Sequence, residues 1–114
     1  MIEPWNITVV QPAVKPVFKG ASPLRRDALR ENLERACEHV RVAAKWSRSK
    51  VVVFPEFFLH GFQPGRSNED WIDASMRLDG PELAELGKPF DDSYRIKLCK
   101  CGLRLALHYA EHYL

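Results

Sequence analysis

The chain has 114 residues, 46% of them hydrophobic, which is the size and composition of one globular domain or of a piece of one. Its 17 Lys and Arg residues against 15 Asp and Glu residues give a net charge of +2, and they are spread evenly along the sequence, so we expect neither nucleic acid nor a membrane as partner. The longest apolar run, Val51–Phe54, is too short to span a bilayer, and the N-terminus lacks the pattern of a signal peptide. We therefore expect a cytoplasmic protein.

The three cysteines, Cys37, Cys99 and Cys101, are an odd number without the spacing of a disulfide framework, so we expect reduced thiols. Cys99 and Cys101 could bind a metal together with His108 and His112, but a zinc site normally needs a second ligand pair at suitable spacing. The sequence between these two pairs is typical of a strand rather than of a zinc knuckle. We expect neither a metal nor a cofactor.

The first half of the chain predicts a strand, a long helix and a second strand. Ile7–Val10 is β-branched and ends before Pro12, which suits a buried strand. Ser22-Pro23 has the residue types of an N-cap and a first helical residue, and the helix that it opens should extend to about Trp46. A cysteine on its apolar face is expected to be a buried, unreactive thiol. The apolar residues recur at intervals of three and four and predict a face that packs on a sheet: Leu29, Leu33, Ala36, Cys37, Val40, Ala43 and Ala44.

A single carboxylate follows the second predicted strand. Lys50–Phe54 is almost continuously apolar, which predicts a central strand covered on both faces. Glu56 comes directly after the proline that ends this strand, at the carboxyl end of the sheet, where α/β proteins carry their chemistry. Residues 57–65 are aromatic but broken by glycine and proline, which predicts an ordered loop over a pocket. A carboxylate buried behind Phe54, Phe57 and Phe58 would have a raised pKa.

The second half predicts further helices and a third strand. Asn68–Met76 should form a short helix with its first residue as N-cap, and Pro81 should open another helix that Pro89 interrupts. Tyr94–Cys101 is predicted to be helical, and Leu103–Tyr109 alternates enough to form a strand. The order β-α-β-α-β predicts a layered α/β fold.

The residues around Glu56 resemble a known family. Val53-Phe54-Pro55-Glu56, followed by an aromatic loop containing Gly61-Phe62, is similar to the first signature of the nitrilase superfamily of carbon–nitrogen hydrolases. Other segments follow in that family's order and extend the resemblance over nearly the whole chain: Gln11, Asn32 with Ala36, Gly80-Pro81-Glu82, and residues 101–111.

The resemblance implies a fold and a chemistry. Residues 1–114 would form the N-terminal, incomplete part of a four-layer α-β-β-α sandwich, whose Glu-Lys-Cys catalytic set comes from three signatures. Glu56 matches the glutamate, the general base that activates the cysteine thiol and later the hydrolytic water, whereas no lysine or cysteine here matches the other two signatures. The implied substrate is a small-molecule nitrile or amide, and complete relatives would be homo-oligomeric. Aliphatic amides, carbamoyl amines and amidated cofactors also remain possible substrates.

Three hypotheses follow for this chain. It is a fragment of such a hydrolase, a non-catalytic module that binds a partner through the uncovered face of its sheet, or a small α/β domain unrelated to hydrolysis. An evolved binding module should carry polar residues or guarding charges on its exposed strands. Because Val51–Phe54 and Leu105–Leu107 are plain core sequence, the hydrolase fragment is favoured.

Overall fold

The computed structural model describes residues 4–77 and 79–91. The predicted order β-α-β-α is confirmed within them, while the predicted elements Tyr94–Cys101 and Leu103–Tyr109 lie outside the described residues, as do the possible metal ligands Cys99, Cys101, His108 and His112. None of the described helices is long and apolar enough to cross a membrane. The elements form a small mixed α/β unit: β1 (Asn6–Val9), α1 (Arg26–Lys45), β2 (Ser49–Val53), α2 (Asn68–Ala74) and α3 (Pro81–Asp91).

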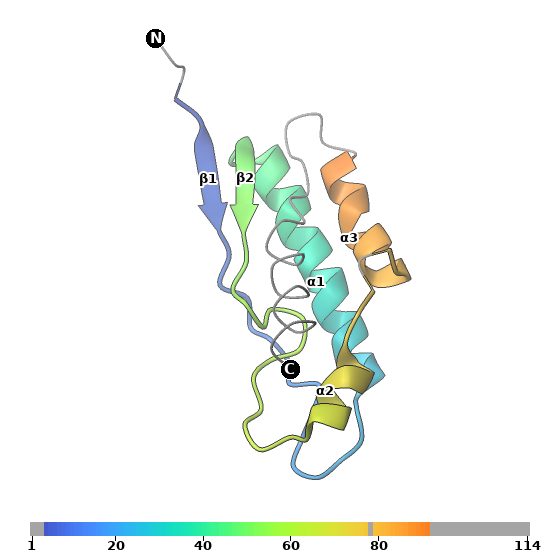
Figure 1. Ribbon diagram of the computed structural model, residues 1–114. Helices are drawn as coiled ribbons and strands as arrows, with labels where there is room; N and C mark the ends of the chain where they lie inside the picture. Colours follow the sequence, from blue (N-terminus) through green and yellow to red (C-terminus); the bar gives the residue numbers. More distant parts are fainter. Residues whose placement is uncertain (1–3, 78, 92–114) are drawn as a thin grey trace, which may run out of the picture.

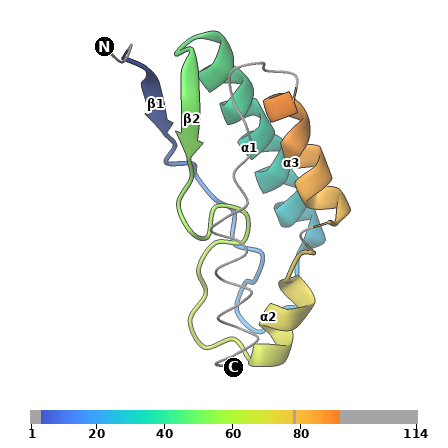
Figure 2. The ribbon, with the colours of Figure 1, turned by 45° about the horizontal axis from the view of Figure 1, so that its top comes forward.

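The two strands are parallel neighbours joined by α1, as a strand–helix–strand crossover requires. Ile7 pairs with Val51 and Val9 with Val53, and a register shift between Asn6 and Ile7 leaves Lys50 without a partner in the ladder. Figure 1 shows β1, β2, α1 and α3 side by side, with α2 at the end of the molecule towards which the strand arrows point. The turned view in Figure 2 gives the same order, so the helices lie on one side of the sheet.

Helix α1 provides most of the core. Its predicted apolar face is confirmed, since the predicted residues other than the half-buried Ala44 are buried, and they pack between β2 on one side and α3 on the other. From α3, Leu83 and Leu86 are buried in the same cluster. Leu29, Leu33, Ala36, Cys37, Val40 and Ala43 are the confirmed residues of α1.

The outer face of the sheet contradicts the expectation that β2 is covered on both faces. Val52 packs against the core on the α1 side, but the outward side chains Ile7, Val9, Val51 and Val53 are 39–68% exposed. The continuous apolar run of the strand therefore supplies one core face and one exposed face. Burying such aliphatic side chains is favourable, so this surface requires a cover for full stability.

Two helix starts differ from the sequence prediction. Helix α1 begins at Arg26 rather than at Pro23, because Arg25 N donates to Val17 O at 2.8 Å and holds the preceding residues extended. Helix α2 is capped by Ser67 instead of Asn68 and ends at Ala74. Ser67 Oγ accepts from Asp70 N and Asp70 Oδ2 accepts from Ser67 N, a reciprocal capping box.

Pro89 does not interrupt α3, contrary to prediction, because another residue replaces the hydrogen bond that proline removes. A proline has no N–H and leaves the carbonyl four residues earlier, Glu85 O, without its helical donor. Cys37 Sγ of α1 lies 3.7 Å from that carbonyl and donates to it. Burial raises the pKa of the Cys37 thiol, which keeps the S–H group in place as a donor. The predicted unreactive thiol therefore has a structural partner.

Pro89→Ala should stabilise the protein by about 1–3 kcal/mol, because it restores an N–H for Glu85 O and removes a helix-breaking ring. In that background, Cys37→Ala should cost about 1 kcal/mol less than in the wild type, since the carbonyl no longer depends on the thiol. Denaturant unfolding of the four proteins measures this coupling. Val40→Ala, on the same face of α1, is the control. If the destabilisation caused by Val40→Ala fell in the Pro89→Ala background by as much as that caused by Cys37→Ala, the hydrogen bond assigned to Cys37 and Glu85 O would be contradicted.

Candidate functional site

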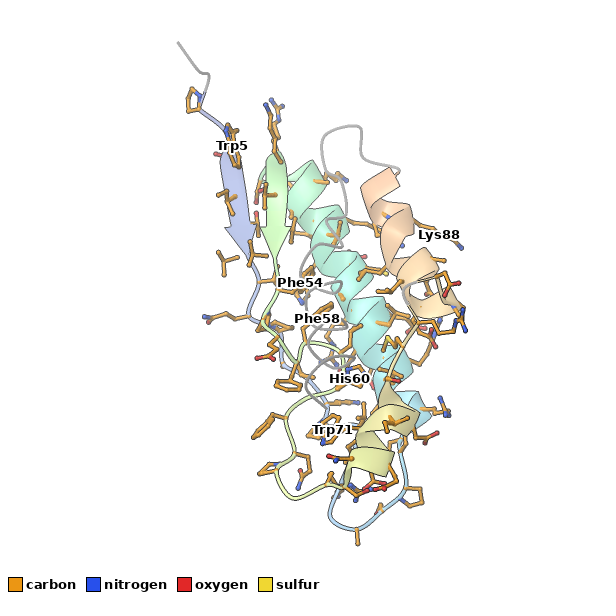
Figure 3. All side chains as sticks on the ribbon, viewed as in Figure 1. Trp5, Phe54, Phe58, His60, Trp71 and Lys88 are labelled. Atoms are coloured by element: carbon orange, nitrogen blue, oxygen red, sulfur yellow. The ribbon has the colours of Figure 1, made fainter. Side chains whose placement is uncertain are left out.

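Glu56 lies in a turn that begins directly after β2. Phe58 N donates to Pro55 O at 3.3 Å and Gly61 N donates to Phe57 O at 2.8 Å, so the chain turns twice within residues 55–61. The predicted position at the carboxyl end of a parallel strand is found, and Figure 3 shows Phe54, Phe58 and His60 following one another from the end of β2 towards α2. The site is thus a carboxylate on a short, hydrogen-bonded turn.

Asn32 of α1 supports this turn through hydrogen bonds of its buried side chain. It is 3% exposed, and its Nδ2 donates both to Leu59 O at 2.9 Å and to Lys15 O at 2.7 Å. Its Oδ1 accepts from Lys15 N at 3.0 Å. A buried amide with these partners is satisfied, and losing it would leave buried backbone groups unpaired. Asn32 therefore joins the loop that follows β1 to the turn that follows β2.

The loop after β1 is held by two further residues of α1. Lys15 Nζ donates to Glu31, and Arg35 Nη1 donates to Ala13 O at 2.6 Å. Arg35 Nη2 also donates to Glu31 Oε1 at 2.6 Å, so the carboxylate bridges the two cations. The hydrogen bond from Lys15 lowers the pKa of Glu31, with a smaller contribution from Arg35. These contacts fix residues 13–15 on α1, beside Asn32.

Gly61 lets the turn approach the loop after β1 closely. Val17 N donates to His60 O at 3.0 Å, and a Cβ atom on Gly61 would lie 3.1 Å from Pro16 Cα. Gly61 also has a φ of +67°, in the left-handed region that favours glycine. Both requirements explain why the predicted loop needs glycine at this position.

The aromatic side chains that precede and follow Glu56 in the sequence pack in two groups. The rings of Phe54 and Phe58 stack with centroids 4.6 Å apart and pack against the core. The ring of Phe57 lies 5.3 Å from that of Phe62 and 6.0 Å from that of Trp71 in α2. The turn is therefore anchored on both sides by apolar contacts. His60 adds a polar anchor, since its Nε2 lies 2.8 Å from Ala74 O at the end of α2.

The Glu56 carboxylate itself is exposed to solvent. The condition considered from the sequence, a carboxylate buried behind Phe54, Phe57 and Phe58, is therefore not met; those rings make the contacts just described. No hydrogen bond or ion pair joins it to any residue of 4–77 or 79–91. Such an arrangement leaves the carboxylate available to accept a proton from a group brought to this edge.

The thiol nucleophile that the resemblance implies is not placed beside Glu56 in the part of the chain that the structure describes. The thiol described there, Cys37, is buried between α1 and α3 and engaged with Glu85 O. The same residues contain no cluster of His, Cys, Asp and Glu side chains suited to a metal ion. The described residues thus present an exposed carboxylate without an accompanying free thiol or metal cluster.

Of two residues that support the site, one gave a signal in the sequence and the other did not. A polar Asn32 on an otherwise apolar helix face was a visible signal, because buried polar groups need partners. Arg66 gave no signal: its guanidinium lies 4.3 Å from the ring centroid of Phe18 and donates to Gly20 O and Ser22 O at 2.7 and 2.9 Å. These contacts link the α2 end of the molecule to the loop before α1.

Comparisons of this chain with protein-family models, with curated proteins and with solved structures found no match.

Gly61→Ala should destabilise the protein by about 2–4 kcal/mol, because it combines left-handed strain with a clash against Pro16. Gly65→Ala is the matched control, since Gly65 has a φ of +84° but open space around its would-be Cβ. We expect Gly65→Ala to cost only about 1 kcal/mol, the backbone contribution alone. Chemical denaturation measures both values, and equal costs would contradict the close approach.

Proposed function

We propose that this chain supplies the general base, Glu56, of a carbon–nitrogen hydrolase of the nitrilase type, acting on a small nitrile or amide. The observation that carries the proposal is the exposed Glu56 carboxylate at the carboxyl end of β2, free of partners in the described residues. The similarity of residues 53–62 to the family's first signature supports the same role. A general base needs this kind of access to the proton that it removes.

The chemistry requires two further groups. Attack on a nitrile or amide carbon needs a thiolate nucleophile and a positively charged donor for the developing negative charge. Glu56 would accept the thiol proton and later activate the water that hydrolyses the thioester. The lysine and cysteine would come from polypeptide beyond this chain, and we expect residues 1–114 alone to be inactive.

The uncovered sheet supports the idea of an incomplete sandwich. Helices α1 and α3 lie on one side of the sheet, as Figure 2 shows, and the other side exposes Ile7, Val9, Val51 and Val53. In a four-layer α-β-β-α sandwich this apolar face would contact a second sheet. The described unit would then be one α layer and part of one β layer.

Sequencing the locus and its transcript beyond the codon for Leu114 tests the proposal. We expect a continuation, in phase or shifted, that encodes the lysine and cysteine signatures. In the protein so completed, Glu56→Gln should lower kcat by about 100- to 10,000-fold, because the general base is lost. Glu69→Gln, an exposed carboxylate of α2, should leave kcat unchanged. Full activity of the Glu56→Gln protein, or a continuation unrelated to the family, would exclude the proposal.

A second function has a specific observation in its favour: the exposed apolar sheet face could bind a partner protein in a non-catalytic module. The two proposals differ for the isolated chain. An incomplete sandwich should self-associate through this face, whereas a module evolved to stand alone should be a cooperative monomer.

We expect the isolated chain to self-associate and the double variant Val9→Lys/Val53→Lys to be monomeric, since charges on the face oppose burial. Size-exclusion chromatography with light scattering measures the mass of each. Ile72→Lys, which changes a highly exposed aliphatic residue of α2, is the control and should not alter association. A monomeric wild type with a sharp thermal transition would favour the module.

A further inference from the structure

One end of the molecule gathers exposed aromatic side chains. Asn6 Nδ2 donates to Ser47 O at 2.7 Å, which ties the start of β1 to the turn between α1 and β2. Trp5 and Trp46 flank these two residues in the sequence and are 47% and 74% exposed. Figure 3 shows Trp5 at this end, far from the labelled residues around Glu56. The two indoles thus lie at the end opposite the candidate catalytic turn.

The same end carries several exposed cations. Lys45, Arg48 and Lys50 are exposed, and none forms an ion pair with another residue of the described chain. Nearby, Arg41 is balanced by Glu38 at 3.5 Å. Positive and negative charges are interspersed along the sequence, but at this end of the structure positive charges are in excess. We call this surface, formed by Trp5, Val42, Lys45, Trp46, Arg48 and Lys50, the basic end.

The last turn of α1 exposes apolar side chains beside charged ones. Val42 and Trp46 are one turn apart and both exposed, Val42 to 44%, so an apolar pair faces solvent rather than the core. Lys45 Nζ lies 5.2 Å from the ring centroid of Trp46. Exposed indole and aliphatic groups between lysine and arginine side chains are typical of segments that lie in a membrane interface.

Arg48 occupies a backbone conformation that disfavours it. Its φ is +48°, the single positive value at a non-glycine residue in the described ranges, and glycine would adopt it without strain. The turn therefore carries a charged side chain at a position where the fold alone would be better served by glycine. Replacing Arg48 by glycine should therefore relieve backbone strain while removing the charge, so that an effect on binding can be told apart from a loss of stability.

We propose that the basic end binds an anionic membrane surface peripherally. Trp46 and Val42 enter the boundary between headgroups and acyl chains, and Lys45, Arg48 and Lys50 contact the lipid phosphates and carboxylates. The aliphatic side chain beside the indole favours lipid over single-stranded nucleic acid, whose bases stack on aromatic rings alone. Net charge does not reveal this surface, because acidic residues elsewhere cancel its cations in the total.

Vesicle sedimentation of the full chain tests the proposal. We expect the chain to sediment with vesicles of equal parts phosphatidylcholine and phosphatidylserine, but not with phosphatidylcholine alone, and to be released by high salt. Arg48→Gly should weaken partitioning about fivefold, the effect of one cation near an anionic surface, while its thermal midpoint is unchanged or higher. Trp46→Ala should weaken partitioning as well, and Lys45→Gln should reproduce the Arg48→Gly loss.

Lys19→Gln is the matched control, because Lys19 is an exposed cation that precedes α1, at the opposite end of that helix. It should leave partitioning unchanged. The proposal is overturned if the chain does not sediment with the anionic vesicles, if Lys19→Gln is as harmful as Arg48→Gly, or if a short oligothymidylate binds with the same dependence on Trp46 while the vesicles do not.

Discussion

The three hydrogen bonds of Asn32 connect the parts of this molecule that the candidate site depends on. The side chain is buried in α1, yet its partners are backbone groups of the two loops that leave the carboxyl ends of β1 and β2. Parallel strands release their chains at the same edge, and one amide between the two exits fixes both. The Glu56 turn therefore takes its position from the helix that forms the core. A residue that looks like an interruption of an apolar face is the link between core and site.

The elements of the fold were largely readable from the sequence. The apolar spacing of α1 predicted its buried face, and the β-branched runs predicted both strands to within a residue or two. These signals are local, because periodicity and β-branching act through the chain's own neighbours. The position of Glu56 was predicted by the same local reasoning, because it follows the apolar run that forms β2, whereas its proposed role came from the resemblance to a family.

The errors have long-range causes. The helix through Pro89 depends on a donor from Cys37, which is distant in sequence and invisible to a propensity argument. The exposure of Glu56 depends on where the neighbouring aromatic rings find partners, which include Trp71 of α2. The start of α1 depends on the bond between Arg25 and Val17. In each case a tertiary contact overrode a sound local expectation.

The contacts of Glu85 also fix the axial position of α3 relative to α1. Its carbonyl accepts from Cys37, and its carboxylate accepts from Arg30, two residues of α1 separated by about two helical turns, or roughly 10 Å. Leucine contacts between two helices tolerate sliding, because one apolar side chain can replace another. The two bonds of Glu85 do not tolerate sliding. If α3 slipped by one turn along α1, the bonds to Cys37 and to Arg30 would both break. Helix α3 is therefore held in one axial register against α1 by two bonds from a single residue.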